Sequence, residues 1–306
     1  MRDGYGTGVV KVGKRNEDVV VLCADLTEST RSMAFKQEYP ERFFEVGVAE
    51  QNMAGIAAGL ALSGKIPFIS SYAVFSPGRN WDQIRISICY SGANVTVIGA
   101  HAGISVGPDG ATHQALEDIA IMRVLPRMTV ICPVDAIETE KAVIASTKIK
   151  GPVYIRFGRD PVPIVTTKQT PFKIGKAEVY KEGTDVSIIA CGTLVFEALV
   201  AAKKLGKRNI KAQVINNHTV KPLDSKTIIQ AAKKTGAVVT AEQHQVNGGM
   251  GSAVIELLAE KIPVPVERVG VKDTFGESGK PSELMKKYGL TSEHIIQAVL
   301  KVVKRK

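Results

Sequence analysis

Glu50 is the residue whose position most suggests chemistry, because it stands between an apolar strand-like run and a helix rich in Ala and Gly. An acid in the first turn of a helix suits the helix dipole, by roughly 0.3–1 kcal/mol. The flanking segments VGVA and MAGIAAG are apolar enough to predict burial, however, and buried carboxylates are the usual groups of proton transfer. Helix capping and catalysis therefore both stay open for Glu50.

The stretch HAGISVGPDGATHQALEDIA (101–120) carries His101, Asp109 and His113 between a predicted strand and a predicted helix. Loops at the carboxyl ends of strands are where open α/β sheets bind ligands. Glycines let a backbone approach a ligand closely, and this loop holds three: Gly103, Gly107 and Gly110. We expect a binding loop here, with the alternative that His113 is a helix-start residue bonded to the backbone.

Two arginines, Arg156 and Arg159, stand at the end of another predicted strand, in IRFGRDP (155–161). The planar guanidinium group suits bidentate contacts with phosphate. A surface ion pair is the alternative interpretation of either side chain. Both arginines are therefore candidate phosphate ligands.

Alternating strands and helices in the first half of the chain would position these residues. Short apolar, β-branched runs predict strands at 19–26, 95–101, 128–134 and 152–157. Helix-like segments lie between them, at 51–62, 82–90, 113–122 and 136–146. Apolar strands that alternate with helices are typical of a parallel sheet covered on both faces, so we expect an α/β domain.

A proline-rich stretch without helical periodicity, residues 158–175, is the best candidate for a linker. After it the alternation restarts and predicts a second, smaller α/β domain that closes with a helix over 281–303. We therefore divide the chain into residues 1–165 and residues 166–306. The total of 306 residues agrees with two domains of ordinary size, roughly 100–200 residues each.

Composition indicates a soluble globular protein, with 44% apolar and 23% charged residues. The longest run of apolar residues and glycine, 53–62, is far shorter than the roughly 20 residues of a membrane helix. The N-terminus shows no secretory signal, and the four cysteines form no C-x-x-C pair. We therefore expect a cytoplasmic location.

Several other kinds of site are not indicated by the sequence. GESGKPS (276–282) lacks the spacing and the Ser or Thr of a phosphate loop, and neither a metal-binding His–Cys cluster nor a G-x-S-x-G elbow is present. NGGMGSAV (247–254) opens a helix that could receive an anion, although tight strand-to-helix packing is favoured. The net charge of +10 is spread along predicted helices, which favours a solvated surface or phosphorylated substrates over nucleic acid.

Taken together, five ordered stretches resemble the C-terminal half of transketolase, a pyrimidine-binding domain followed by a C-terminal domain. They are ADLTEST (24–30), FFEVGVAEQNMAGIAAGLA (43–61), PFISSYAVFSPGRNWDQI (67–84), GPDGATHQALEDIA (107–120) and GPVYIRFGRDP (151–161). The resemblance covers essentially the whole chain, and runs of this length are far more specific than a lone glycine motif. It implies a parallel-sheet pyrimidine-binding domain and a smaller α/β C-terminal domain.

The resemblance also assigns a role to Glu50. In this family a glutamate in a G-x-x-E-x-x-M context bonds N1′ of the aminopyrimidine of thiamine diphosphate and favours the tautomer that removes the thiazolium C2 proton. Glu50 matches that glutamate. Tyr72 and Phe75 would pack against the aminopyrimidine ring, and Asp25 would lie near the cofactor at a subunit contact.

The remaining matches concern a sugar phosphate. The reaction implied is transfer of a two-carbon ketol unit from a ketose phosphate to an aldose phosphate, as in the pentose phosphate pathway. Asp109 and His113 would bind substrate hydroxyls or assist proton transfer. Four residues resemble those that hold the sugar phosphate: Arg2, Ser29, His101 and Arg159.

One large departure from the family concerns the diphosphate. Transketolases hold magnesium (or calcium) and the diphosphate with a G-D-G sequence and an Asn roughly 25–30 residues later. This chain has only GPDG (107–110), and residues 117–145 contain no Asn. We therefore expect a split transketolase, in which a separate N-terminal subunit supplies that domain and this chain is the C-terminal subunit. A homodimeric core joined by two partner chains is the expected assembly, and a membrane is not an expected partner.

Other functions remain as alternatives. The segment SPGRNWDQI (76–84) is closer to 1-deoxyxylulose 5-phosphate synthase and to the β subunits of 2-oxoacid dehydrogenases than to full-length transketolases. The GPDGATHQ loop favours the first of these two. A non-catalytic binding protein of the same fold is a third alternative, which the joint presence of Glu50, Asp109, His113 and Arg159 argues against.

Overall fold

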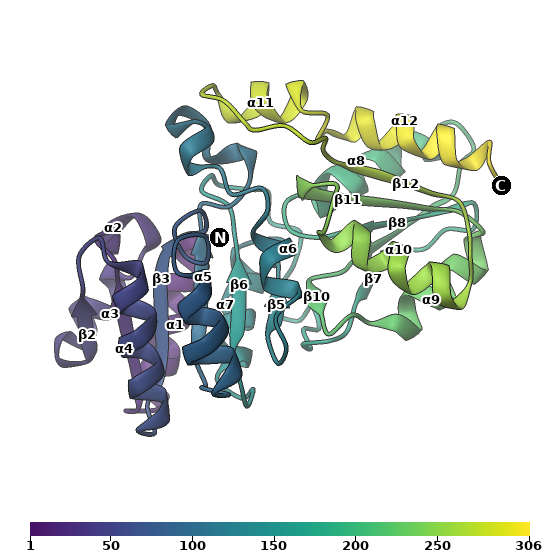
Figure 1. Ribbon diagram of the computed structural model, residues 1–306. Coiled ribbons are helices and arrows are strands. Elements are labelled where there is room, and N and C mark those ends of the chain that lie inside the picture. The colour runs from purple at the N-terminus through teal and green to yellow at the C-terminus, as the bar shows by residue number, and fades with distance from the viewer.

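The computed structural model describes all 306 residues and contains two β-sheets flanked by helices (Figure 1). The strands are β1 (Val19–Cys23), β2 (Phe43–Glu45), β3 (Ile66–Tyr72), β4 (Thr96–Ala100), β5 (Thr129–Ile131), β6 (Val153–Arg156), β7 (Glu178–Lys181), β8 (Val186–Ala190), β9 (Ala212–Asn216), β10 (Thr219–Lys221), β11 (Val238–Gln245) and β12 (Val266–Val271). One sheet has the order β10-β5-β6-β4-β3-β1-β2 and the other β12-β11-β8-β9-β7. Only the pairs β10–β5 and β7–β9 are antiparallel, so the predicted α/β class is confirmed.

Helices cover both sheets. The first half of the chain contains α1 (Arg2–Arg15), α2 (Thr27–Thr30), α3 (Met33–Glu38), α4 (Glu50–Leu62), α5 (Trp81–Gln83), α6 (Asp118–Arg123) and α7 (Ala136–Ser146). It also contains a π-helical segment and three 3₁₀ turns: η2 (Ile84–Tyr90), η1 (Pro40–Arg42), η3 (Ile104–Asp109) and η4 (Ala111–His113). The second half contains α8 (Leu194–Gly206), α9 (Ser225–Thr235), α10 (Met250–Lys261), α11 (Pro281–Lys287) and α12 (Ser292–Val303).

The central strands of the first sheet determine where a site can form. Strands β1 and β4 are buried along their whole length, which explains their continuous apolar sequence. Strands β1, β3, β4 and β6 are parallel neighbours. Their carboxyl ends therefore meet at one edge, where Asp25, Tyr72, His101 and Arg159 lie on or just after the strands.

Four features differ from the sequence-based expectations. The N-terminal helix α1 was not predicted, although it packs on α7 and buries Tyr5 and Val9. The helix expected over 113–122 begins only at Asp118. The closing helix expected over 281–303 is divided into α11 and α12, because Gly289 adopts a left-handed φ of 76° between them.

The fourth difference concerns the division between the two halves. Strand β10 follows the linker in sequence but pairs with β5 of the first sheet. One hydrophobic core accordingly includes both Met122 from the first half and Ile228 from the second. The two halves are thus held together by shared core and shared sheet.

Two further findings bear on what the molecule can bind. At the start of α10, the carboxylate of Glu242 accepts the main-chain N–H groups of Met250 and Gly251, both at 2.7 Å. A Cβ at Gly249 would lie 2.2 Å from Glu242 Oε2 and one at Gly251 would lie 2.6 Å from Thr240 Oγ1, so the favoured interpretation of NGGMGSAV as tight strand-to-helix packing is confirmed. None of the helices has the length and apolar character needed to cross a membrane.

Candidate active site

Glu50 begins helix α4 and its side chain is almost completely buried, with 1% exposed. Its Oε2 accepts a hydrogen bond from Arg79 Nη1 at 2.7 Å, and Ser71 Oγ lies 3.5 Å from Oε1. The Nδ2 of Asn80 donates to the Glu50 carbonyl at 3.1 Å and fixes the start of the helix. The predicted burial is confirmed, and the carboxylate is paired with a cation, as a buried charge must be.

Arg79 was not predicted as a site residue. Its guanidinium lies over the Phe75 ring, 4.6 Å from the ring centre, while 45% of the side chain is exposed. The signal in the sequence was its position in SPGRNWDQI, four residues after an aromatic residue. That spacing places both side chains on one face of a turn.

Four aromatic rings form a continuous cluster next to this pair. Tyr72 stacks on His101 with ring centres 3.9 Å apart and on Phe75 at 6.1 Å. His113 meets Phe75 edge-on at 5.3 Å and Tyr72 edge-on at 6.1 Å. Contacts therefore run without interruption from Glu50 through Phe75 to the two histidines.

His101 is held in a demanding position immediately after β4. Its φ of 54° lies in the left-handed region, which costs a non-glycine residue energy and is common at functional sites. Burial, and then the positive charges of Arg2, Arg159 and His113, lower the pKa of His101 to about 3. The side chain is thus a neutral imidazole, and its buried Nδ1 has no partner within the chain.

Three of the predicted sugar-phosphate residues meet beside His101. Arg2 donates from Nε to the Arg159 carbonyl and from Nη1 to the Ser29 carbonyl, both at 3.0 Å. Arg159 donates from Nη1 to the carbonyl of Val106 and to Oδ1 of Asp109, both at 3.1 Å. Each arginine keeps further N–H groups for a ligand, and the two chain segments that carry them are tied together.

Asp25 is not joined to this cluster. It is exposed, has a left-handed φ of 57°, and uses its main-chain N–H to donate to Glu45 Oε1 at 2.7 Å. Glu45 Oε2 accepts a second bond from Thr27 Oγ1 at 2.6 Å. Asp25 therefore lies at the same edge of the sheet, with its carboxylate left free.

The structure adds two findings about the binding loop. At its three glycines the backbone lies close to the second half of the chain, where a Cβ would stand 1.8 Å from Gln243 Oε1 at Gly103, 3.0 Å from Pro281 Cγ at Gly107 and 2.5 Å from Ser278 Oγ at Gly110. His113 does not begin the long helix, and its Nδ1 lies 2.9 Å from Thr112 Oγ1 instead of bonding the backbone. The loop is thus shaped by packing between the two halves.

Arg156 is neither a phosphate ligand nor part of a surface pair. Its side chain is buried, and Nε donates to Asp118 Oδ2 at 2.7 Å. Its Nη2 donates to the Gln243 carbonyl at 2.6 Å, while Tyr154 also donates to Asp118 Oδ2 at 2.7 Å. Arg156 therefore links the two halves of the chain beneath the site.

The arrangement fits the thiamine diphosphate that the resemblance implies. An aminopyrimidine is a flat ring that would have to stack on an aromatic side chain while its N1′ shares a proton with Glu50. Arg79 occupies such a position within the chain, since its flat guanidinium covers Phe75 and donates to Glu50. No group of three or more His, Cys, Asp or Glu side chains is arranged to hold a metal ion.

Comparisons with known families agree with this geometry. The family model described as the transketolase pyrimidine binding domain matches residues 1–164, and the one described as the transketolase C-terminal domain matches residues 175–295. A structure of a split gene transketolase, an inactive beta4 tetramer, superimposes with a TM-score of 0.93 and is 49% identical. That match covers 99% of this chain and 98% of the other.

Two curated relatives match over nearly their full length. The 6-deoxy-6-sulfo-D-fructose transketolase subunit SqwH of Clostridium sp. is 44% identical, covering 100% of this chain and 95% of its own. One of the subunits of an apulose-4-phosphate transketolase of Phocaeicola vulgatus is 37% identical, covering 99% and 97%. The chain belongs to the transketolase family and contains its pyrimidine-binding and C-terminal domains.

Proposed function

We propose that this chain is the C-terminal subunit of a split transketolase that transfers a two-carbon ketol unit from a ketose phosphate to an aldose phosphate. The observation that carries the proposal is the buried Glu50 carboxylate, which faces a flat N–H donor stacked on Phe75. Residues 1–165 would form the thiamine diphosphate pyrimidine-binding domain and residues 166–306 the C-terminal domain.

Glu50 would hold the aminopyrimidine through a hydrogen bond to its carboxylate, and Tyr72 and Phe75 would support the ring. When bound, thiamine diphosphate supplies the carbanion that cleaves and forms the carbon–carbon bonds. The 45% exposure of Arg79 allows its side chain to turn into solvent and release Glu50. Burial of Glu50 strengthens its bond to the cofactor, because water does not compete for the carboxylate.

The substrate phosphate would be bound by the arginines beside His101. Arg2 and Arg159 are held by main-chain carbonyls, so their free N–H groups are already oriented for a phosphate or a neighbouring hydroxyl. Ser29, whose carbonyl orients Arg2, would contribute its hydroxyl. Neutral His101 would bond a substrate oxygen without adding charge.

His113 and Asp109 would act on the sugar hydroxyls. His113 stands edge-on to Phe75, so its ring borders the place assigned to the cofactor. Its Nδ1 is bonded to Thr112, which leaves Nε2 to accept or donate a proton at the substrate. Asp109 is paired with Arg159 and would exchange that partner for a substrate hydroxyl.

The proposal requires a second polypeptide. A partner with the G-D-G…N motif would hold magnesium or calcium and the diphosphate, and Asp25 would face it from the sheet edge. Helix α4 supports self-association: its inner face buries Met53 and Ala57, whereas its outer face exposes Ile56 and Leu62. Figure 1 shows α4 on the side of the first sheet away from the second one, where a further chain can reach it.

Reconstitution tests the proposal directly. Ketol transfer from xylulose 5-phosphate to ribose 5-phosphate would be measured with thiamine diphosphate and magnesium, for this chain alone, for the partner alone and for both. We expect activity only in the mixture, because each chain supplies half of the cofactor site. Other sugar phosphates would then rank the donors and acceptors.

Pyruvate provides the discriminating control. Transfer from pyruvate but not from a ketose phosphate, in a mixture that is folded and associated, would overturn the ketol-transferase assignment in favour of a synthase of the deoxyxylulose type. Failure of the two chains to associate, with both folded, would overturn the assignment as a subunit.

A further inference from the structure

Two cysteines from different halves of the chain meet next to Arg156. Cys132 directly follows β5 of the first sheet, and Cys191 directly follows β8 of the second. Figure 1 shows β5 on the side of the first sheet that borders the second half. Each cysteine is 1% exposed, and neither has a role in the proposed ketol transfer.

The main chain holds the two cysteines close together across the junction of the two halves. The N–H of Gly192, which follows Cys191, donates to the Cys132 carbonyl at 3.1 Å, and a Cβ at Gly192 would lie only 2.9 Å from Cys132 Sγ. The N–H of Cys132 itself donates to the His218 carbonyl at 2.7 Å. The N–H of Cys191 donates to the Ala241 carbonyl at 3.2 Å. Both thiols are thus carried by anchored main chain, and the two segments are in direct contact.

The surroundings of the two thiols give them different acidities. A hydrogen bond from the Cys191 thiol lowers the pKa of Cys132; burial opposes this shift, and the charge of Arg156, whose Nη1 lies 3.9 Å from Cys132 Sγ, adds to it. The same hydrogen bond, followed by burial, raises the pKa of Cys191. Since the thiolate is the reactive form of cysteine, Cys132 is the thiol that attacks first, and Cys191 is the one that stays protonated beside it.

A small cavity adjoins Cys132 and is also lined by Arg156 and Gln243. Its volume is about 10 Å³, which is about the space of one water-sized molecule. The cavity also borders Ala102, the residue that follows His101, so it lies next to the candidate active site. An oxygen atom of hydrogen peroxide is of the same size as a water molecule and fits beside the sulfur of Cys132.

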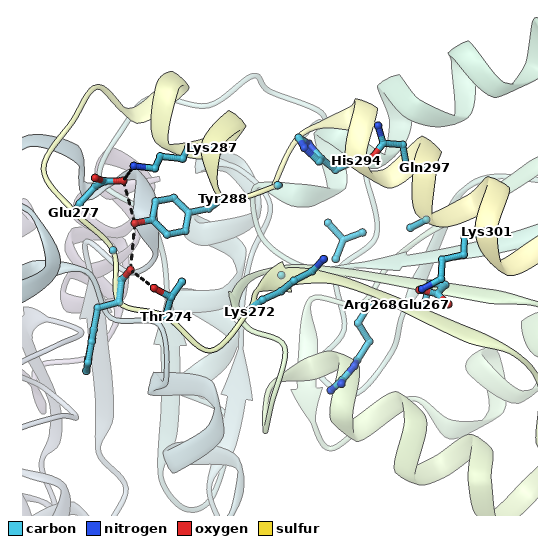
Figure 2. A pocket seen from close by; sticks show the side chains of 16 residues that line it. Glu267, Arg268, Lys272, Thr274, Glu277, Lys287, Tyr288, His294, Gln297 and Lys301 are labelled. Atoms are coloured by element: carbon cyan, nitrogen blue, oxygen red, sulfur yellow. Dashed lines mark hydrogen bonds and ion pairs between the residues drawn. The ribbon is translucent and has the colours of Figure 1, made fainter.

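A larger cavity in the second half offers no thiol to an oxidant. It has a volume of about 950 Å³ and lies between β12, the segment that follows β12, and helices α11 and α12 (Figure 2). Figure 2 shows its wall tied by the Glu277–Lys287 pair and by the Tyr288 hydroxyl, which lies 3.2 Å from Glu277 Oε1. No cysteine lines it. We therefore expect a small oxidant to react at the junction of the two halves and not in the wider cavity.

We propose that Cys132 and Cys191 form a reversible disulfide when the chain meets hydrogen peroxide. The Cys132 thiolate attacks one peroxide oxygen, the O–O bond breaks, and the departing hydroxide takes up the proton that the thiol had released, which gives a sulfenic acid and one water. The Cys191 sulfur then displaces the hydroxyl group from Cys132, and a second water leaves as the S–S bond forms. The two thiols lose two electrons in total, and the peroxide gains them. A dithiol reductant reverses the bond by exchange.

The disulfide would lock the junction of the two halves. In the reduced chain this junction is held by noncovalent contacts, such as the hydrogen bond from Arg156 Nη2 to the Gln243 carbonyl at 2.6 Å. A disulfide restricts the unfolded chain and so stabilises the folded one, provided that the sulfur atoms meet without distortion of the main chain. The ends of β5 and β8 are already hydrogen-bonded to each other through Cys132 and Gly192. We therefore expect the oxidised chain to resist unfolding better than the reduced one.

Peroxide titration of the native, fully reduced chain tests the proposal. The thiols that remain would be alkylated after unfolding, and the peptides of a digestion without reductant would be identified by mass spectrometry. We expect two of the four thiols to disappear together and one pair of peptides to be joined through Cys132 and Cys191. C132S should form no disulfide, and C191S should stop at a sulfenic acid that dimedone traps. C89S, a matched change of another buried cysteine, should react as the unchanged chain does.

Urea unfolding of the same samples measures the effect on the junction. The midpoint of the oxidised chain should exceed that of the reduced chain and should fall back after treatment with dithiothreitol. An unchanged midpoint in the linked chain would overturn the locking of the junction.

Two outcomes of the titration would overturn the disulfide itself. One is the persistence of all four thiols at a peroxide concentration that fully oxidises free glutathione under the same conditions. The other is a disulfide that still forms in C132S or that joins two chains. Neither assay uses the partner chain or the cofactor, so failure here leaves the ketol-transfer proposal standing, and failure of ketol transfer does not affect the disulfide.

Discussion

Two acid–arginine pairs in this chain are built alike and placed differently. Glu50 and Asp118 are each the first residue of a helix, each is 1% exposed, and each accepts an arginine N–H at 2.7 Å. Their partners differ: 5% of the Arg156 side chain is exposed, against 45% of the Arg79 side chain. In the closed pair, Asp118–Arg156, the protein buries both side chains, whereas in the Glu50–Arg79 pair it buries only the acid.

The difference separates a structural pair from an exchangeable one. Asp118 also accepts from Tyr154, and Arg156 also donates to Gln243, so neither partner can leave without exposing buried polar groups. Arg79 rests on the face of Phe75 and can turn into water. A buried carboxylate whose only cation can depart is suited to receive a cationic or N–H-bearing ligand.

The largest effect is expected for E50Q. In the reconstituted enzyme, ketol transfer should fall by roughly 10²–10⁴-fold, the usual contribution of a positioned proton-transfer group. The unfolding free energy should change by less than about 1 kcal/mol, because Arg79 can turn to solvent. Activity assays and denaturant titration of the same variant would measure both quantities.

The matched control is E38Q, which removes an exposed carboxylate at the end of α3 that has no partner in the chain. It should retain both activity and stability. Full activity in E50Q would remove Glu50 from the mechanism and with it the distinction between the two pairs.

Next in size is the effect of R156A on stability. The variant leaves Asp118 as a buried charge without its cation and should lower the unfolding free energy by about 3–5 kcal/mol. K65A, which breaks the exposed pair with Asp18 at 2.9 Å, should cost less than about 1 kcal/mol. A loss in R156A no greater than in K65A would contradict the structural role of the closed pair.

Sequence alone predicted much of this site because strand ends are marked by polar residues. Glu50, His101, His113 and Arg159 were expected near strand ends from the sequence pattern, whereas Tyr72 was expected only from the family resemblance. Tyr72, His101 and His113 lie in one continuous set of ring contacts that Phe75 and Arg79 extend to Glu50. Parallel strands place such residues together whatever the intervening length. Predicting which residues meet in this way requires only that the strands be recognised in the sequence.

What sequence could not predict depends on contacts between distant segments. Arg156 and Arg159 had the same interpretation, and only the pairing of Arg156 with Asp118 and Gln243 separates them. In sequence, the glycines of the loop 101–113 look like those of a ligand-binding loop. In the structure, their close neighbours come from residues 243–281. Strand β10 likewise joins a sheet begun far earlier in the chain, which no local pattern specifies.

R79A tests the Glu50–Arg79 pair by removing its cation instead of its acid. Without Arg79, the cofactor-free chain keeps a buried Glu50 with only the distant Ser71 hydroxyl, which should cost about 1–3 kcal/mol of stability. In the reconstituted complex with thiamine diphosphate the loss should shrink, because the cofactor takes the place of Arg79. R85A, an exposed arginine on η2 without an ion pair, is the control and should show no loss in either state. Equal losses for R79A in both states would show that Arg79 never leaves Glu50.

The smallest effect concerns two buried histidines, one in each of the compared regions. His101 lies in the site, and His218 stacks on Phe172 near the junction of the two halves. Burial, with added positive charge at His101, lowers their pKa values to about 3 and about 4. In the unfolded chain both histidines have a pKa of about 6.5, so below that pH the unfolded state binds more protons than the folded state.

Stability should therefore decrease by up to about 1.4 kcal/mol per pH unit for each histidine below pH of about 6.5, until the folded-state pKa is reached. H101N and H218N should each remove one such contribution when unfolding free energies at pH 5 and pH 7 are compared. Only H101N should also raise the KM for a sugar phosphate in the reconstituted enzyme, because His101 lies beside Arg2 and Arg159, the proposed phosphate ligands, whereas His218 stacks on Phe172. An equal rise of KM in H218N would mean that the junction of the two halves and the candidate site respond together. The difference between the Asp118–Arg156 and Glu50–Arg79 pairs would then be one of burial and not one of function.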